Sequence, residues 1–182
     1  MSAFEFVLTL YAIVIALGVA RVLTGYVALI EFRRGVVDAP LFFIWLSFLL
    51  LVHFVWWFSL WNNSAAQSFS LIAAIVQFHV PAFLFIASRL LVPSESELET
   101  IAERFAKLRV PFLVCLALPF VTPLLGTIAT GDWSIAMYLL PIGAVLLLGT
   151  ASSNIRLQYS VALAAFLIYV VFAVQFRSAV SG

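Results

Sequence analysis

Between residues 40 and 61 the chain reads PLFFIWLSFLLLVHFVWWFSLW, an apolar and aromatic run without a charged side chain. A helix of about 20 such residues crosses the hydrocarbon core of a bilayer. The rest of the chain has the same character, since 65% of its 182 residues are hydrophobic and only 9% are charged. An ordinary soluble domain is about half apolar and about a quarter charged. The composition therefore predicts an all-α membrane protein whose main solvent is lipid.

Similar apolar stretches precede and follow this run. Together they predict one transmembrane domain, residues 1–182, built as a bundle of about six helices. The fifth stretch is the shortest of them. The expected spans are residues 4–30, 40–61, 69–92, 110–129, 134–150 and 157–176.

The only long polar segment lies at residues 94–109, between the third and fourth expected spans. Its apolar residues recur at helical spacing, and acidic residues open it while basic residues close it, as a helix dipole favours. We therefore expect a short amphipathic helix along the cytoplasmic face. The apolar positions are Leu98, Ile101, Phe105 and Leu108.

The distribution of lysine and arginine predicts the orientation of the bundle, because cytoplasmic loops are enriched in both. Of the basic residues outside the spans, only Arg177 falls on the side of the two termini, so both termini are expected outside. The net charge of +1 gives no electrostatic argument for binding nucleic acid. The basic residues assigned to the cytoplasmic loops are Arg33, Arg34, Arg104, Lys107, Arg109 and Arg156.

Arg21 lies inside the first expected span, about 6 Å to the cytoplasmic side of its midpoint. It shares one face with Gly18 and Gly25, and we call these three residues the glycine stripe. Small residues let a second helix approach closely, so the stripe is expected to face the bundle interior. Two interpretations of Arg21 remain open: a contact with an anion or carbonyl inside the bundle, or a side chain that extends along its own helix to the membrane surface.

The only two histidines, His53 and His79, fall inside the second and third expected spans at nearly the same depth. They are candidates to share a ligand or a proton, with Gln77 nearby. Histidines on adjacent helices can also clamp haem b axially, which makes them possible haem ligands. A metal site of another kind is not expected, because no acidic ligand lies nearby in either span. Hydrogen bonds from the histidines to neighbouring helices are the alternative explanation.

No sequence motif nominates an enzyme. The chain has no HExxH, no GxSxG, no P-loop and no glycine-rich dinucleotide turn. No catalytic residue is therefore assigned, and Cys115 is interpreted as a small core side chain.

Residues 16–25 (ALGVARVLTG) and 53–57 (HFVWW) resemble an uncharacterised group of small bacterial polytopic inner-membrane proteins. The similarity extends over the first three expected spans. The resemblance implies a multi-pass protein of a bacterial inner membrane, and it implies no activity.

Three functional hypotheses follow from these observations. The first is a channel or transporter for a small solute or ion, with Arg21, His53, Gln77 and His79 along its pathway. The second is a non-catalytic structural or accessory subunit of a membrane complex. The third is a b-type haem protein for electron transfer that uses the two histidines. In each case the partners are the lipid bilayer and either further copies of the chain or other membrane subunits.

Overall fold

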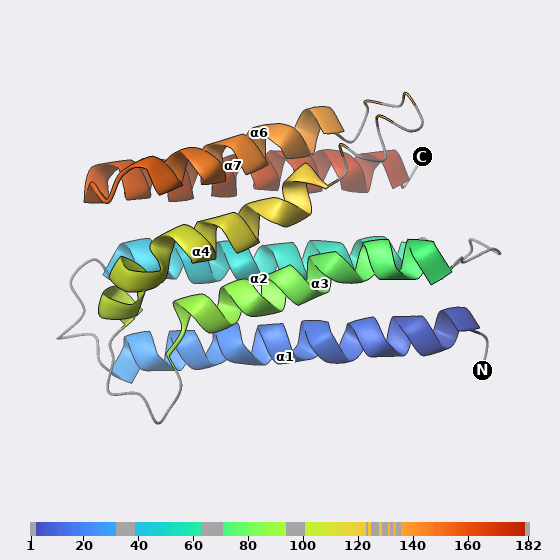
Figure 1. Cartoon of the computed structure of the whole chain (residues 1–182), viewed down its shortest axis with the longest axis horizontal. Coiled ribbons are helices and arrows are strands. Elements are labelled where there is room, and N and C mark those ends of the chain that lie inside the picture. The colour runs from blue at the N-terminus through green and yellow to red at the C-terminus, as the bar shows by residue number, and fades with distance from the viewer. Residues whose placement is uncertain are drawn as a thin grey trace.

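The computed structural model describes residues 3–31, 39–62, 71–93, 101–122, 124, 128, 131, 133 and 136–180. Within these residues the chain forms six α-helices and one short 3-10 helix, with no strand (Figure 1). The all-α prediction is therefore confirmed. The elements are α1 (Ala3–Glu31), α2 (Ala39–Asn62), α3 (Leu71–Leu91), α4 (Ile101–Val121), α6 (Ala136–Leu148), η2 (Gly149–Ala151) and α7 (Ile155–Val180).

Three helices are long and apolar enough to cross a membrane, over Glu5–Glu31, Ala39–Trp61 and Ile155–Gln175. Two shorter apolar helices accompany them, over Gln77–Leu91 and Ala136–Ala151. Large apolar side chains are exposed along whole helix faces, as is expected of a surface that contacts lipid. On α1 this exposed face includes Phe6, Leu10, Ile13 and Leu17.

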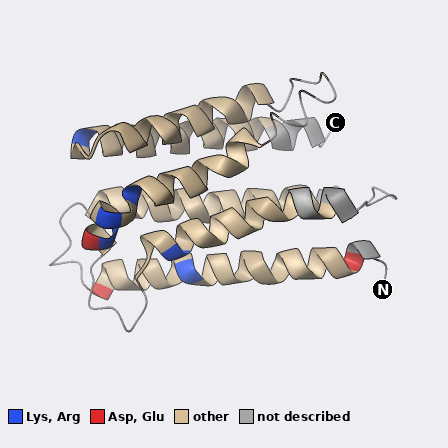
Figure 2. Cartoon of the chain, viewed as in Figure 1, with Lys and Arg blue, Asp and Glu red and all other residues tan. Residues whose placement is uncertain are grey.

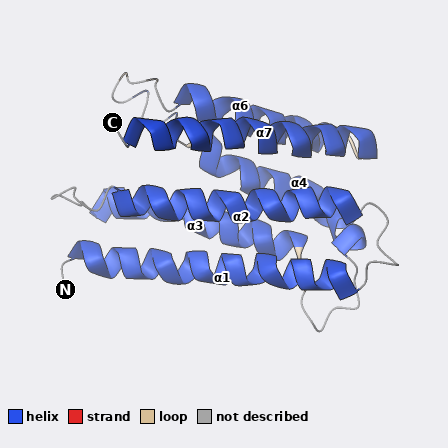
Figure 3. Cartoon of the chain, turned by 180° about the vertical axis from the view of Figure 1, so that it is seen from behind, coloured by secondary structure: helices blue, strands red, loops and turns tan. Residues whose placement is uncertain are grey.

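The helices form a closed ring, in which each helix contacts the next in the order α1, α3, α4, α6, α7, α2 and back to α1. Figures 1 and 3 show this bundle from opposite sides, with α4 crossing obliquely from the level of α2 and α3 towards α6. The two chain termini lie at the same end of the bundle (Figure 1).

Aromatic side chains fill the space between α2, α4 and α7. Trp45 on α2 packs edge-on against Phe112 on α4, with ring centroids 5.4 Å apart and an interplanar angle of 87°. Phe48, one turn further along α2, meets Phe120 of α4 and Tyr169 of α7 at 6.1 and 5.7 Å. The contacts with Phe112 and Tyr169 are edge-to-face, and aromatic contacts of this kind add to the stabilisation from burial. We call these five residues the aromatic core.

The amphipathic segment expected at residues 94–109 is not separate from the fourth span in the structure. One continuous helix, α4, runs from Ile101 to Val121, and residues 94–100 lie outside the described part of the chain. The reason is that buried residues recur at helical spacing on one face, without interruption, from the expected amphipathic segment into the expected fourth span. One helix therefore packs against the bundle along its whole length. The stripe comprises Ile101, Phe105, Phe112, Leu116 and Phe120.

Candidate functional site

The glycine stripe of α1 faces the bundle interior, as the sequence predicts. Both glycines are buried. A Cβ atom added at Gly18 would lie 2.2 Å from Nε2 of His53 on α2. At Gly25 it would lie 2.8 Å from a side-chain carbon of Leu46 on α2 and 2.8 Å from one of Val92 at the end of α3. Only glycine therefore lets α1 come this close to its neighbours.

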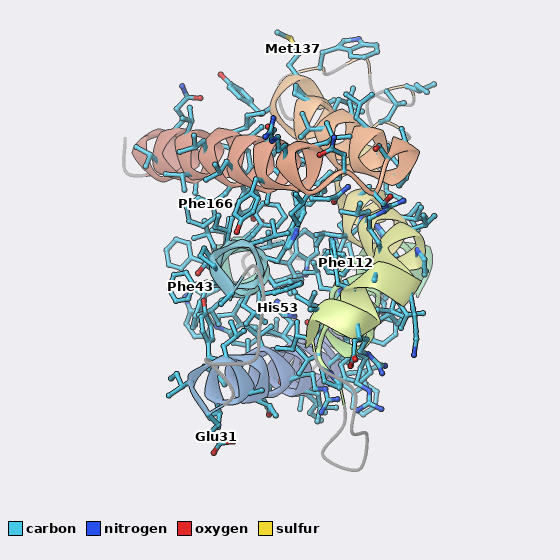
Figure 4. The ribbon with its side chains drawn as sticks, turned by 90° about the vertical axis from the view of Figure 1, so that its left-hand side faces the viewer. Glu31, Phe43, His53, Phe112, Met137 and Phe166 are labelled. Carbon is cyan, nitrogen blue, oxygen red and sulfur yellow. The ribbon has the colours of Figure 1, made fainter. Side chains whose placement is uncertain are left out.

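His53 is completely buried between α2 and α1 (Figure 4). Its Nδ1 atom lies 2.7 Å from the carbonyl oxygen of Leu49, one turn earlier on α2. A carbonyl oxygen only accepts, so Nδ1 carries the proton and Nε2 is left with a lone pair. Nε2 has no hydrogen-bond partner among the described residues, and it faces Gly18. His53 thus places an unused hydrogen-bond acceptor inside the bundle.

Trp56 follows His53 by three residues, which places the two side chains one turn apart on α2. Its Nε1–H group is buried and has no acceptor among the described residues. The indole packs both against the main core and against a small cluster formed by Tyr11 and Ile15 of α1 with Leu60 of α2. A buried donor and a buried acceptor, both unused, therefore lie on neighbouring turns of α2.

Arg21 binds the end of α3. Its Nη2 atom donates to the carbonyl oxygen of Val92 at 2.8 Å. Arg104 of α4 donates to the same helix end, from Nε to the Leu90 carbonyl at 3.0 Å and from Nη2 to the Arg89 carbonyl at 3.1 Å. The last carbonyls of a helix have no partner within the helix and carry its negative dipole end, so two guanidinium groups stabilise them. Of the two interpretations of Arg21, the structure shows the carbonyl contact.

The helix end that Arg21 binds lies well inside the bundle. Arg21 is ten residues from Glu31, the last residue of α1, which is about 15 Å along the helix axis. Helix α3 stops at Leu91 because Pro93 disfavours a helical conformation of the residue before it. Helix α3 therefore ends short of the charged end of α1, and its terminal carbonyls need donors from other helices.

His79 is directed at a different helix from His53. Its Nε2 atom lies 2.5 Å from Oγ1 of Thr122, just after α4. The Thr122 hydroxyl donates to the carbonyl oxygen of Leu118 at 2.9 Å, so His79 donates to Thr122. Gln77 is half-buried and precedes His79 by two residues, which places it on nearly the opposite side of α3.

The four residues predicted to line a pathway are thus only partly brought together. His53 faces Gly18, and Arg21 lies one turn further along the same face of α1. His79 instead contacts Thr122, just after α4. The Nε2 atoms of the two histidines face Gly18 and Thr122 in place of a common ligand. Joint axial ligation of haem stays a prediction, and this conformation does not favour it.

Sequence reasoning missed Arg104 and Trp56 as members of the site. Arg104 falls in a segment that is expected to lie along the cytoplasmic face, and Trp56 is one of many aromatic residues in the second expected span. Neither position carries a local signal, because each contact depends on how distant helices pack. No protein-family model, curated protein or solved structure matches the chain. Its function is therefore inferred from the residues of the site.

Proposed function

We propose that this chain is a multi-pass membrane protein that lets a small solute or ion cross the bilayer along α1, between α2 and the end of α3. The observation that carries this proposal is the buried Nε2 atom of His53, an unused acceptor inside an apolar bundle. An unpaired polar group in such surroundings costs free energy and is commonly retained for function. Arg21, on the next turn of the glycine stripe, makes the same interface polar and charged.

The centre of the ring is a poor pathway, because the aromatic core occupies it. The interface of α1 is different, since two glycines and two polar side chains lie there. In the present conformation Gly18 lies directly against His53, so the pathway is closed. Passage requires α1 to move away from α2, which is easier across a glycine surface than across interlocking large side chains.

The proposed orientation places the charged end of the bundle in the cytoplasm of a bacterial cell and both termini outside. Figure 2 shows that the described Lys and Arg residues gather towards the end opposite both termini, which supports this orientation. Single cysteines test it in a Cys115→Ser background. At the exposed position Glu103, a membrane-impermeant thiol reagent should react only after permeabilisation, and at Glu5 it should react in intact cells. The reverse pattern would overturn the orientation.

Proteoliposome swelling, followed by light scattering with a panel of small solutes and ions, tests the proposed transport. At least one solute should enter faster than in protein-free vesicles. The Arg21→Ala, His53→Ala double variant should bring that rate to the protein-free level. Arg156→Ala, which removes an exposed arginine at the start of α7, should leave it unchanged. Undiminished entry in the double variant would remove Arg21 and His53 from the pathway.

An accessory subunit of a membrane complex is the second candidate. It is favoured by polar side chains that bind backbone carbonyls of other segments, which suits a rigid scaffold. Besides the half-buried Arg21 and Arg104, the buried Gln158 amide donates to the carbonyls of Gly149 and Ser152, just before its own helix, at 2.8 and 2.7 Å. Purification in mild detergent separates the two candidate functions, because a subunit brings its partners while a transporter gives the chain alone or as a homo-oligomer.

The haem hypothesis is tested by the visible absorption spectrum of the same purified protein. A Soret band that is lost in His53→Ala would support it.

A further inference from the structure

We propose that His53 and Trp56 form a binding site for a small neutral molecule that carries a hydroxyl or amide N–H group. The molecule enters between α1 and α2 when Gly18 moves off the imidazole. Only the step of passage rests on the proposed function, because binding at this site needs no transport.

The chemistry of the ligand follows from the two unused atoms. Nε2 of His53 has a lone pair, so the ligand must present a hydrogen-bond donor to it. Nε1–H of Trp56 is a donor, so the ligand must also present an acceptor. The oxygen of a hydroxyl group fills both roles, and so does a primary amide through its N–H and C=O groups.

The charge of the ligand follows from Arg21, which lies one turn from Gly18 on the same face of α1. A cation would be repelled by the guanidinium group in this apolar setting. An anion that carries no proton offers only acceptor atoms, so one of its lone pairs would face the lone pair of Nε2 of His53 and be repelled by it. Neutral polyols, ureas and water satisfy both conditions, which makes them the class that the site accepts.

The site is closed in the present conformation. A hydrogen-bonded oxygen lies about 2.9 Å from its nitrogen partner. At Nε2 that space belongs to Gly18, because even a single Cβ atom there would lie 2.2 Å from the nitrogen. Binding therefore requires α1 and α2 to separate locally, and a side chain at position 18 would fill the space that the ligand needs.

Histidine-selective ¹⁵N NMR of the whole chain in lipid nanodiscs tests this site, because the chain has only two histidines. The resonance that persists in His79→Gln belongs to His53. Addition of urea or glycerol should shift the Nε2 signal upfield in a saturable way, whereas tetramethylurea, which lacks an N–H donor, should not. No shift with either donor, or an equal shift with tetramethylurea, would overturn the proposal.

Two variants identify the atoms involved. Gly18→Ala should abolish the response, because the added methyl group covers Nε2. Gly143→Ala is the matched control, since its Cβ would lie 2.9 Å from Val121, between α6 and α4, and the response should remain. Trp56→Phe keeps the aromatic ring but loses the donor, and should weaken apparent binding about three- to tenfold. A full response in Gly18→Ala together with unchanged binding in Trp56→Phe would contradict the assignment.

The two proposals fail in different ways. A saturable shift at His53 without solute entry into proteoliposomes would keep the site and remove transport. Solute entry without any shift at His53 would keep transport and remove the site.

Discussion

Helix α2 packs against its neighbours through two faces of opposite character. Towards α4 and α7 it presents Trp45 and Phe48, whose rings interlock with rings of the facing helices. Towards α1 it presents His53, and the facing residue is Gly18. The first face holds the helices through large side chains, although Trp45 also brings a buried Nε1–H group that has no partner among the described residues. The second brings backbones together and contains unused polar atoms. On the account proposed above, the aromatic face holds the fold and the glycine face carries the function.

The largest expected effect is on the aromatic face. Trp45→Ala removes a completely buried side chain that contacts Phe48 and Phe112, and should lower the free energy of unfolding by about 3–5 kcal/mol. Unfolding of the protein in mixed micelles by increasing sodium dodecyl sulfate measures this loss. Trp61→Ala is the control, because that indole is 60% exposed and its removal should change stability little. Equal losses in the two variants would mean that the aromatic core does not hold the bundle.

Arg21→Ala should have the next largest effect, because it leaves the Val92 carbonyl at the end of α3 without this donor. The expected loss is about 1–3 kcal/mol in the same unfolding experiment. Arg21→Lys should recover part of it, since an ammonium group donates but lacks the reach and shape of a guanidinium group. Arg156→Ala should cost nothing measurable. Full stability in Arg21→Ala would show that the helix end is satisfied in another way.

Gly18→Ala should destabilise the protein by about 1–3 kcal/mol through overpacking against His53. The cost should nearly vanish in a His53→Ala background, where the imidazole is gone. A double-mutant cycle measures this coupling. If the two substitutions add without coupling, the close contact between Gly18 and His53 is not what limits the size of residue 18.

The smallest expected effect concerns the second histidine. Thr122→Val keeps the shape of the side chain but removes the hydroxyl that His79 contacts, and should cost about 1 kcal/mol. In the ¹⁵N NMR spectrum the His79 Nε2 signal should shift while that of His53 stays in place. A shift of both signals would show that the two imidazoles are coupled, contrary to their placement against different helices.

The sequence predicts the three longest helices well because apolar length alone specifies them. The expected spans at residues 4–30, 40–61 and 157–176 coincide closely with α1, α2 and α7. The inward position of Arg21 was also predictable, because Gly18 and Gly25 flank it on one face. In each case the signal lies within a single helix.

The remaining features depend on contacts between distant parts of the chain. The bond between Arg21 and Val92 joins residues 71 positions apart, and that between His79 and Thr122 joins residues 43 apart. Their formation depends on the order of helices around the ring and on the rotation of each helix. Hydropathy carries no information on either, so the sequence leaves open whether the two histidines share a ligand or bond to neighbouring helices. In the structure His79 contacts Thr122 and His53 faces Gly18.

A disulfide lock across the α1–α2 interface tests the central claim most directly. The Cδ2 atom of Leu46 lies 2.8 Å from the position that a Cβ atom added at Gly25 would take. In a Cys115→Ser background, Gly25→Cys together with Leu46→Cys therefore places two thiols at the α1–α2 interface, away from His53. Oxidation should stop solute entry into proteoliposomes, and reduction should restore it. Each single cysteine should be insensitive to oxidant. Entry that continues unchanged in fully cross-linked protein would show that solute does not pass between α1 and α2.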